Sequence, residues 1–149
     1  MISSEDIERN GLTWAMSDNF RLKRDPVVVN TDITYGAGVH WIVIAPLSDC
    51  VYIYDPLGPS NKRATGSGLP SDGYIINRLH KQGHQIIKWY PYTSQLKSSS
   101  LCGWFSIFVA KILNALGSPS AAEATAAIHS QFGKRADASD ERLLRKVFS

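Results

Sequence analysis

Runs of β-branched and aromatic residues, separated by polar turns, predict a small β-sheet in the middle of the chain. Each run is bounded by proline, glycine, serine or aspartate, which is typical of strands. The runs are 26–32, 36–46, 49–56 and 84–92. A polar connection of only Ser48 and Asp49 joins the second run to the third, and so short a connection predicts a hairpin. We therefore expect the second and third runs to be antiparallel neighbours.

Helical signals flank these runs. The first helix is expected to start at Ser3 or Ser4, with acidic residues in its first turn, and to end at Gly11. Residues 14–26 then predict a second short helix or a turn. Later helices are expected at 71–83, 101–117, 120–133 and 139–148. The segment 101–117 is apolar around most of its circumference, so it is expected to be buried. Its polar or small interruptions are Gly103, Ser106, Lys111 and Asn114.

The order of these elements predicts an α+β fold in which a small mixed sheet packs against a central helix that begins near Cys102. The remaining polar segments, 58–73 and 94–100, read as loops. A chain of 149 residues is of ordinary size for one domain, so a single domain spanning 1–149 is expected.

Composition narrows the function classes. The apolar share of 44% and charged share of 19% are globular values. A net charge of +3 permits contact with nucleic acid without arguing for it. Two cysteines, Cys50 and Cys102, cannot build a disulfide framework or a four-cysteine zinc site, and no metal or cofactor is expected. No signal peptide and no membrane-length apolar run is found, so we expect neither secretion nor membrane insertion.

Cys102 stands where a helix is expected to begin, and this position favours chemistry. Unpaired N–H groups and the helix dipole lower the pKa of a thiol there, and the thiolate is the nucleophile. The serines 98–100 are possible caps of this helix. Gly103 would let another backbone approach closely. The alternative interpretation is that Cys102 is simply a small buried hydrophobic residue.

A nucleophilic cysteine needs a base, and His40 is the best placed of the four histidines. It follows glycines, which leave room for a substrate backbone, and it precedes a buried strand. Asp55 ends the next strand of the hairpin, so it is expected to face His40 and to orient the imidazole. His40 as a satisfied core histidine and Asp55 as an ordinary strand-ending acid are the alternatives.

Gln95 lies seven residues before Cys102 in a serine-rich loop. Its amide can fold back to bind the oxyanion that forms when a thiolate attacks a carbonyl, together with a backbone N–H at the cysteine. Each of these signals is weak alone. Their joint order, His, Asp, Gln and then Cys-Gly at a buried helix start, is hard to obtain by chance.

These residues lie in a pattern that resembles a known family. The stretches VNTDITYGAGVHWIVIAP, YIYDPLGPS and SQ-x6-CGWF are similar to the adenain family of adenovirus-type maturation proteases, which shares a clan with SUMO and ubiquitin-like-protein proteases. The resemblance covers about Val29 to Phe108. It implies a permuted papain-like fold and cysteine endopeptidase activity.

The resemblance also implies roles for individual residues. Cys102 would be the nucleophile, His40 the general base and acid, Asp55 the orienting carboxylate and Gln95 an oxyanion donor. Trp41 and Trp104 would form walls of a narrow cleft that admits glycine-containing sites, with Gly103 also in the substrate-binding region. Here the third catalytic residue is Asp, as in SUMO proteases, where adenain has Glu.

The resemblance further implies partners and location. Substrates would be virion precursor proteins, in the virion and the host-cell nucleus or cytoplasm, and the protein is expected to be a monomer. Adenain is activated by a viral peptide joined through a disulfide and by DNA. The matching segment 84–92 has no cysteine, so disulfide activation is not supported, and a DNA activator would rest only on the small charge excess.

Three other interpretations stay open. The same chemistry would serve a deubiquitinase or SUMO-type protease that acts on host conjugates, or an acyltransferase of the same clan. A catalytically inactive module that binds protein or nucleic acid is the third, although such a module has no reason to keep all four residues.

Overall fold

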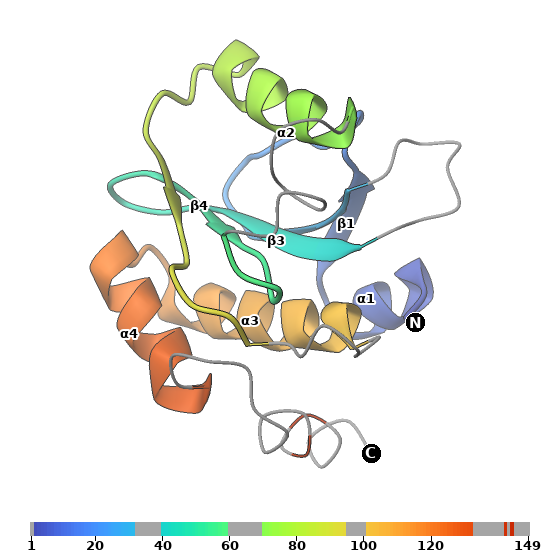
Figure 1. The fold of residues 1–149 in the computed structure, drawn as a ribbon, viewed down its shortest axis with the longest axis vertical. Coiled ribbons are helices and arrows are strands. Elements are labelled where there is room, and N and C mark those ends of the chain that lie inside the picture. The colour runs from blue at the N-terminus through green and yellow to red at the C-terminus, as the bar shows by residue number, and fades with distance from the viewer. Residues whose placement is uncertain are drawn as a thin grey trace.

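A five-stranded mixed sheet separates two layers of helices (Figure 1). The computed structural model describes residues 2–31, 40–59, 70–94 and 101–132 and the helical residues 142 and 144, with only the backbone described for 70–74. The strands, in their order across the sheet, are β1 (Thr13–Met16), β2 (Val27–Asn30), β3 (Trp41–Pro46), β4 (Val51–Tyr54) and β5 (Ile87–Trp89). The β1–β2 and β4–β5 pairs are parallel, and the two inner pairs are antiparallel. The expected α+β class with a mixed sheet is confirmed.

Helices cover both faces of this sheet. Helix α2 (Pro70–Lys81) lies on one face, and the other is covered by α1 (Ser4–Arg9), α3 (Cys102–Leu116) and α4 (Ala121–Phe132) (Figure 1). The side chains of β3 alternate between the two layers, because successive residues of a strand point to opposite faces. Val43 packs in the core cluster that contains α3, and Ile44 packs in the cluster that contains Leu79 of α2. Central strands buried on both faces read as continuous apolar runs, as Val27–Asn30 and Trp41–Pro46 do.

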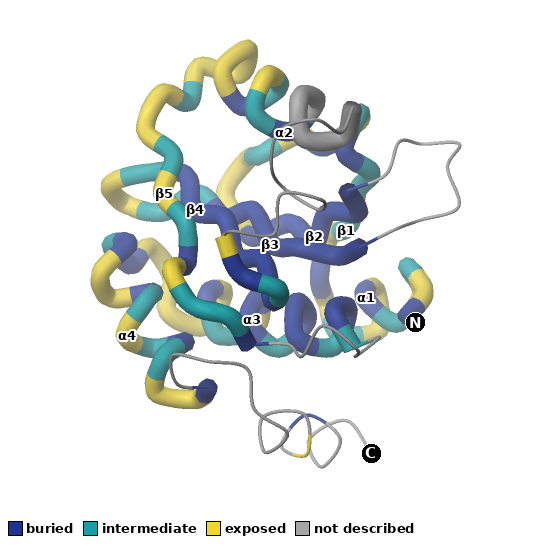
Figure 2. The backbone as a smooth tube through the Cα atoms, viewed as in Figure 1, coloured by how far each residue is buried: buried dark blue, intermediate teal, exposed yellow. Residues whose placement is uncertain are grey.

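Helix α3 is the buried helix that the sequence predicts. Much of its length is buried between the sheet and α4, as the dark segments of Figure 2 indicate. Its buried residues include Phe105, Ile107 and Leu113, which are almost completely inaccessible to solvent. The helix therefore holds its first residue, Cys102, in a fixed place against the sheet.

The predicted hairpin is also present. β3 pairs with β4 from Pro46↔Val51 to Val43↔Tyr54, and the Leu47 N–H donates a hydrogen bond to the Cys50 carbonyl across the turn at 2.9 Å. This register places the beginning of β3 beside the end of β4, at the same end of the two strands.

Several boundaries differ from the expectations. Of the short helix or turn expected within 14–26, the helix is wrong, because residues 13–16 form strand β1, and the turn is confirmed at 17–19. The first helix agrees: Ser3 is its N-cap, in a capping box with Asp6, and Gly11 follows its end in the left-handed region at φ 73°. Helix α2 starts at Pro70, slightly before the predicted cap.

Some predicted segments lie outside the described residues. These are 60–69 and 95–100 of the two loops, the glycine-rich approach to β3, and most of the helix expected at 139–148, of which Leu144 is described as helical and buried. Among the helices that the structure does describe, none combines the length and the apolar character needed to cross a bilayer.

Candidate active site

Cys102 is the first residue of α3 and is 4% exposed. The N-cap of this helix is Leu101, with no side-chain cap hydrogen bond, so the prediction of a serine cap is wrong; serines 98–100 themselves lie outside the described residues. The first N–H groups of a helix have no partner within the helix and favour a negative charge. Here the Gly103 N–H stabilises the thiolate form of Cys102.

His40 immediately precedes β3 and is 5% exposed. Its backbone is fixed to β2, because its carbonyl accepts a hydrogen bond from the Thr31 N–H at 2.8 Å. Its ring nitrogen Nε2 lies 2.7 Å from Oδ1 of Asp55, which is 1% exposed. This buried contact is the one expected from the hairpin. The β3–β4 hairpin brings the start of β3 next to the end of β4, so His40 and Asp55 meet just beyond its last pair, Val43↔Tyr54.

Asp55 is held in place by the turn that follows β4. The sequence Asp-Pro-Leu-Gly has the residues that a β-turn favours at its first, second and fourth positions. The Asp55 carbonyl accepts a hydrogen bond from the Gly58 N–H at 2.9 Å, and its Oδ1 also accepts one from the Leu57 N–H at 2.8 Å. Gly58 lies in the left-handed region at φ 92°, where glycine is favoured. The turn therefore fixes the carboxylate oxygen that meets His40.

On its other side His40 interacts with Cys102, and each of the two groups shifts the pKa of the other, which completes a chain of three residues. Asp55 engages Nε2, so Nδ1 is the ring nitrogen left for the thiol. Among the described residues, Asp55 and Cys102 act on the pKa of His40, and His40 acts on the pKa of Cys102.

The electrostatics of the chain favour an ion pair. Burial on its own lowers the pKa of His40, but the hydrogen bonds with Asp55 and Cys102 and their charges outweigh it and raise that pKa to about 9. Burial on its own raises the pKa of Cys102, but the hydrogen bond and charge of His40, with the backbone N–H groups of Trp41 and Gly103, outweigh it and lower that pKa. A lowered thiol pKa beside a raised imidazole pKa shifts this pair toward thiolate and imidazolium.

Gln95 lies outside the described residues, but the residue before it does not. Ser94 is completely buried, and its N–H donates a hydrogen bond to the Pro56 carbonyl at 2.8 Å. The segment that leads to Gln95 is thus fixed beside the Asp55 turn. The oxyanion role of Gln95 stays a prediction.

The three predicted substrate contacts have different surroundings. Trp41 is 5% exposed and packs edge-on against Trp14, with ring centroids 6.4 Å apart. Trp104 is half-buried. Gly103 is buried beneath the Ile2 side chain, which would clash with a β-carbon added at Gly103, so the packing of Ile2 already favours glycine there. Their roles in substrate binding stay predictions.

The other histidines lie elsewhere. His80 and His84 are at the end of α2, where the His80 ring contacts the His84 carbonyl, on the sheet face opposite to α3 (Figure 1). His129 of α4 stacks on Tyr92 with ring centroids 5.0 Å apart. In the part of the chain that the structure describes, no cluster of three or more His, Cys, Asp or Glu residues is suited to a metal ion.

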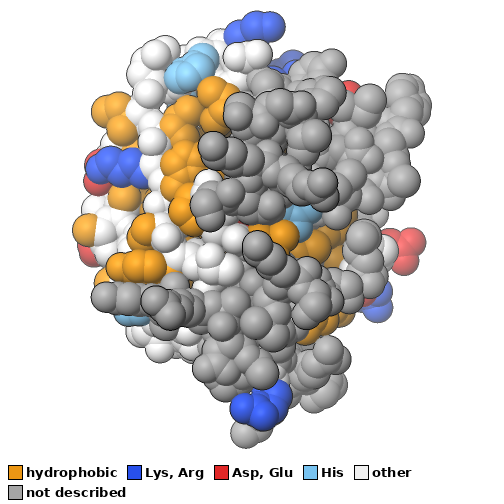
Figure 3. Space-filling view, viewed as in Figure 1, with side chains coloured by type: hydrophobic (Ala, Val, Ile, Leu, Met, Phe, Trp, Pro, Cys, Tyr) orange, Lys and Arg blue, Asp and Glu red, His pale blue; other side chains and the backbone are white. Residues whose placement is uncertain are grey.

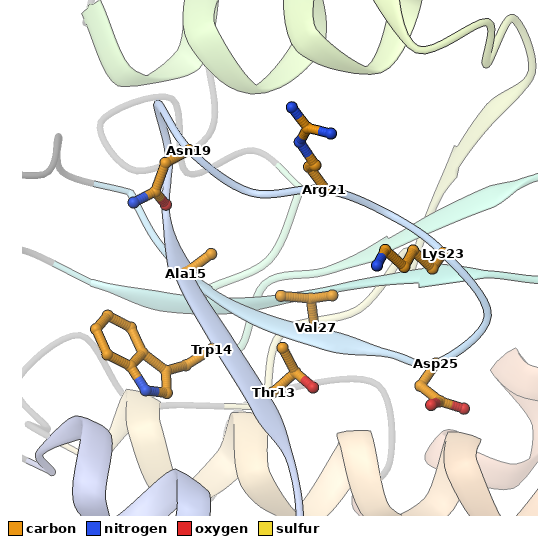
Figure 4. Close-up of a pocket in the computed structure, with 8 residues that line it drawn as sticks. All are labelled: Thr13, Trp14, Ala15, Asn19, Arg21, Lys23, Asp25 and Val27. Carbon is orange, nitrogen blue, oxygen red and sulfur yellow. The ribbon is translucent and has the colours of Figure 1, made fainter.

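A cavity of about 400 Å³ lies at the edge of the sheet, inside the connection between β1 and β2 (Figure 4). Its lining residues are Thr13, Trp14, Ala15, Asn19, Arg21, Lys23, Asp25 and Val27. Its lining includes none of Cys102, His40 and Asp55. On the face shown in Figure 3, the described Lys and Arg side chains lie scattered at the periphery. A DNA activator stays a prediction.

No protein-family model matches the sequence, and no curated protein matches it significantly. The case for function therefore depends on the geometry of Cys102, His40 and Asp55.

Proposed function

We propose that this protein is a cysteine endopeptidase with Cys102 as nucleophile, His40 as general base and acid, and Asp55 as the orienting carboxylate. The observation that carries the proposal is the buried 2.7 Å contact between His40 and Asp55, with His40 also lowering the pKa of a cysteine at a helix start. A structural role alone does not account for this arrangement, because burying a charged pair is costly unless its partners are well placed. A peptidase makes use of such charges, because a negative Cys102 sulfur attacks the substrate while a positive His40 beside it can give up a proton.

The reaction follows from the positions of the protons. The Cys102 thiolate attacks the scissile carbonyl carbon, and the resulting oxyanion is stabilised by the Cys102 N–H and, as the sequence predicts, by the Gln95 amide. Imidazolium His40 gives its proton to the leaving amine as the C–N bond breaks, which leaves a thioester. Neutral His40 then takes a proton from water, whose oxygen attacks the thioester carbon; the C–S bond breaks, the acid is released, and the Cys102 thiolate is restored beside imidazolium His40. Asp55 holds the ring so that one nitrogen faces the sulfur throughout.

The substrate class rests on the resemblance to adenain rather than on a described cleft. Under this proposal the substrates are precursor proteins cut at glycine-containing sites, in a virion or inside a host cell. Glycine fits a slot between bulky walls because it has no side chain to clash with them. A deubiquitinase or SUMO-type protease, an acyltransferase and an inactive binding module would use the same scaffold, and the experiment below separates them.

Peptide-library profiling of the purified protein tests the proposal, in parallel with labelling by ubiquitin and SUMO vinyl sulfones. We expect cleavage of short peptides at glycine-containing sites and no labelling by either vinyl sulfone. Labelling by a ubiquitin-type probe would move the substrate class to host conjugates. Acetyl transfer from a thioester donor without peptide cleavage would identify an acyltransferase. Absence of all three reactions, with the protein folded, would leave only a binding role.

A further inference from the structure

Trp41 pairs with Asn30 of β2, but it lies beyond the last pair of the β3–β4 ladder. The His40 carbonyl bonds to β2 through Thr31, and backbone groups of successive residues in a strand point to opposite sides, so those of Trp41 point toward β4. The last β3–β4 pair is Val43↔Tyr54, and continuing the register by two residues places Pro56 opposite Trp41. Proline has no N–H to donate. The ladder therefore cannot supply a donor for the Trp41 carbonyl.

Helix α3 supplies a hydrogen-bond donor for the Trp41 carbonyl. The Ser106 hydroxyl donates a hydrogen bond to the Trp41 carbonyl at 2.9 Å, and both residues are buried. The Trp41 N–H in turn stabilises the thiolate of Cys102. Cys102 and Ser106 are four residues apart and share one face of α3. The backbone groups of Trp41 therefore interact with this helix face instead of with a β4 residue.

Ser106 is unusual for its position. It is 0% exposed in the middle of an apolar helix, where serine is a poor helix former and an unbonded hydroxyl would be costly. A serine inside a helix commonly bonds to the carbonyl four residues back in its own helix, but the bond recorded for this one reaches another element. Its hydroxyl therefore connects the helix that carries the nucleophile to the strand end that carries the base.

We propose that Ser106 is a positioning residue for the Cys102–His40 pair, an inference that rests on the peptidase function proposed above. By holding the Trp41 carbonyl, it fixes the Trp41 N–H against the sulfur and fixes His40, the adjacent residue, beside it. Small displacements of reacting groups have large effects on the reaction rate. Loss of the Ser106 hydrogen bond is therefore expected to lower the rate, even though Ser106 is too deeply buried to contact a substrate.

Ser106→Ala removes the hydroxyl with little change of volume, and Ser130→Ala is the matched control. Ser130 also donates a serine hydroxyl bond to a carbonyl, at 2.7 Å, but on the exposed side of α4. For Ser106→Ala we expect kcat to fall about tenfold with little change in KM, and the midpoint pH of Cys102 alkylation to rise by about one unit. For Ser130→Ala we expect wild-type values of all three.

A Ser106→Ala variant that keeps wild-type kcat and the wild-type alkylation midpoint overturns the positioning role and leaves the peptidase proposal standing. A wild-type Cys102 that is no more reactive than Cys50 overturns both. If Ser106→Ala does not fold, Ser106→Thr and Ser106→Val are compared, since they have the same shape and differ in the hydroxyl. The threonine variant is expected to exceed the valine variant in kcat, and equal values overturn the inference.

Discussion

Cys102→Ala is expected to reduce peptide cleavage by about 10⁴-fold or more, because no other group in the site supplies the attacking sulfur. Only the β-carbon remains, so neither the covalent intermediate nor the ion pair with His40 can form. The fold should persist, since alanine keeps most of the small volume that Cys102 fills in the core. Initial rates on the best library peptide and circular dichroism of the variant check both expectations.

Cys50→Ala is the matched control, because it removes the only other thiol. Burial, followed by the hydrogen bond and charge of Asp49, raises the pKa of Cys50 to about 11, so it is protonated at neutral pH. Wild-type activity is expected for Cys50→Ala. If the two substitutions had equal effects, the assignment of Cys102 as the nucleophile would be wrong.

Asp55→Asn is expected to lower kcat by about 10²- to 10⁴-fold with a smaller change in KM. The amide oxygen can still accept the Leu57 N–H bond, so the turn is expected to survive. The same oxygen position faces His40 Nε2, so the ring stays oriented but loses the negative charge that stabilises its imidazolium form. The ion pair with Cys102 is weakened, and kcat falls.

The same substitution has a pH signature. The Asp55 hydrogen bond and charge raise the pKa of His40, so losing them lowers it. The alkaline limb of the rate profile, where imidazolium His40 loses its proton, is expected to move from about 9 to lower pH. Asp49→Asn is the control, because this exposed carboxylate pairs with Lys88 and binds the Ala121 N–H far from His40. An unchanged kcat for Asp55→Asn would remove Asp55 from the mechanism.

The sequence alone predicts the His40–Asp55 contact because the determinants are local. A two-residue turn sets the hairpin register, and Pro56 ends the ladder directly after Asp55. The sequence also predicts the buried helix that begins at Cys102, because a helix that is apolar around most of its circumference is stable only in the protein interior. These parts depend on neighbours in the sequence.

Other parts depend on contacts that no local pattern encodes. Strand β1 has only four residues, includes the helix formers Ala15 and Met16, and is stabilised by parallel pairing with β2 after a long connection. The packing of Ile2 over Gly103 joins residues that are about a hundred positions apart. Ser106 left a visible signal, a lone hydroxyl in an apolar helix, but the Trp41 carbonyl as its partner required the sheet register.

The central claim is that Cys102 is a thiolate paired with imidazolium His40 in the free protein at neutral pH. It is tested most directly by the pH dependence of iodoacetamide alkylation, measured for each cysteine by mass spectrometry, with Cys50 in the same chain as internal reference. The account predicts that Cys102 reacts far faster than Cys50 at pH 6 to 7, and that His40→Ala shifts its reactivity to higher pH. If Cys102 and Cys50 react at similar rates across neutral pH, or if Cys102 keeps its profile without His40, the ion pair does not exist and the proposed mechanism is contradicted.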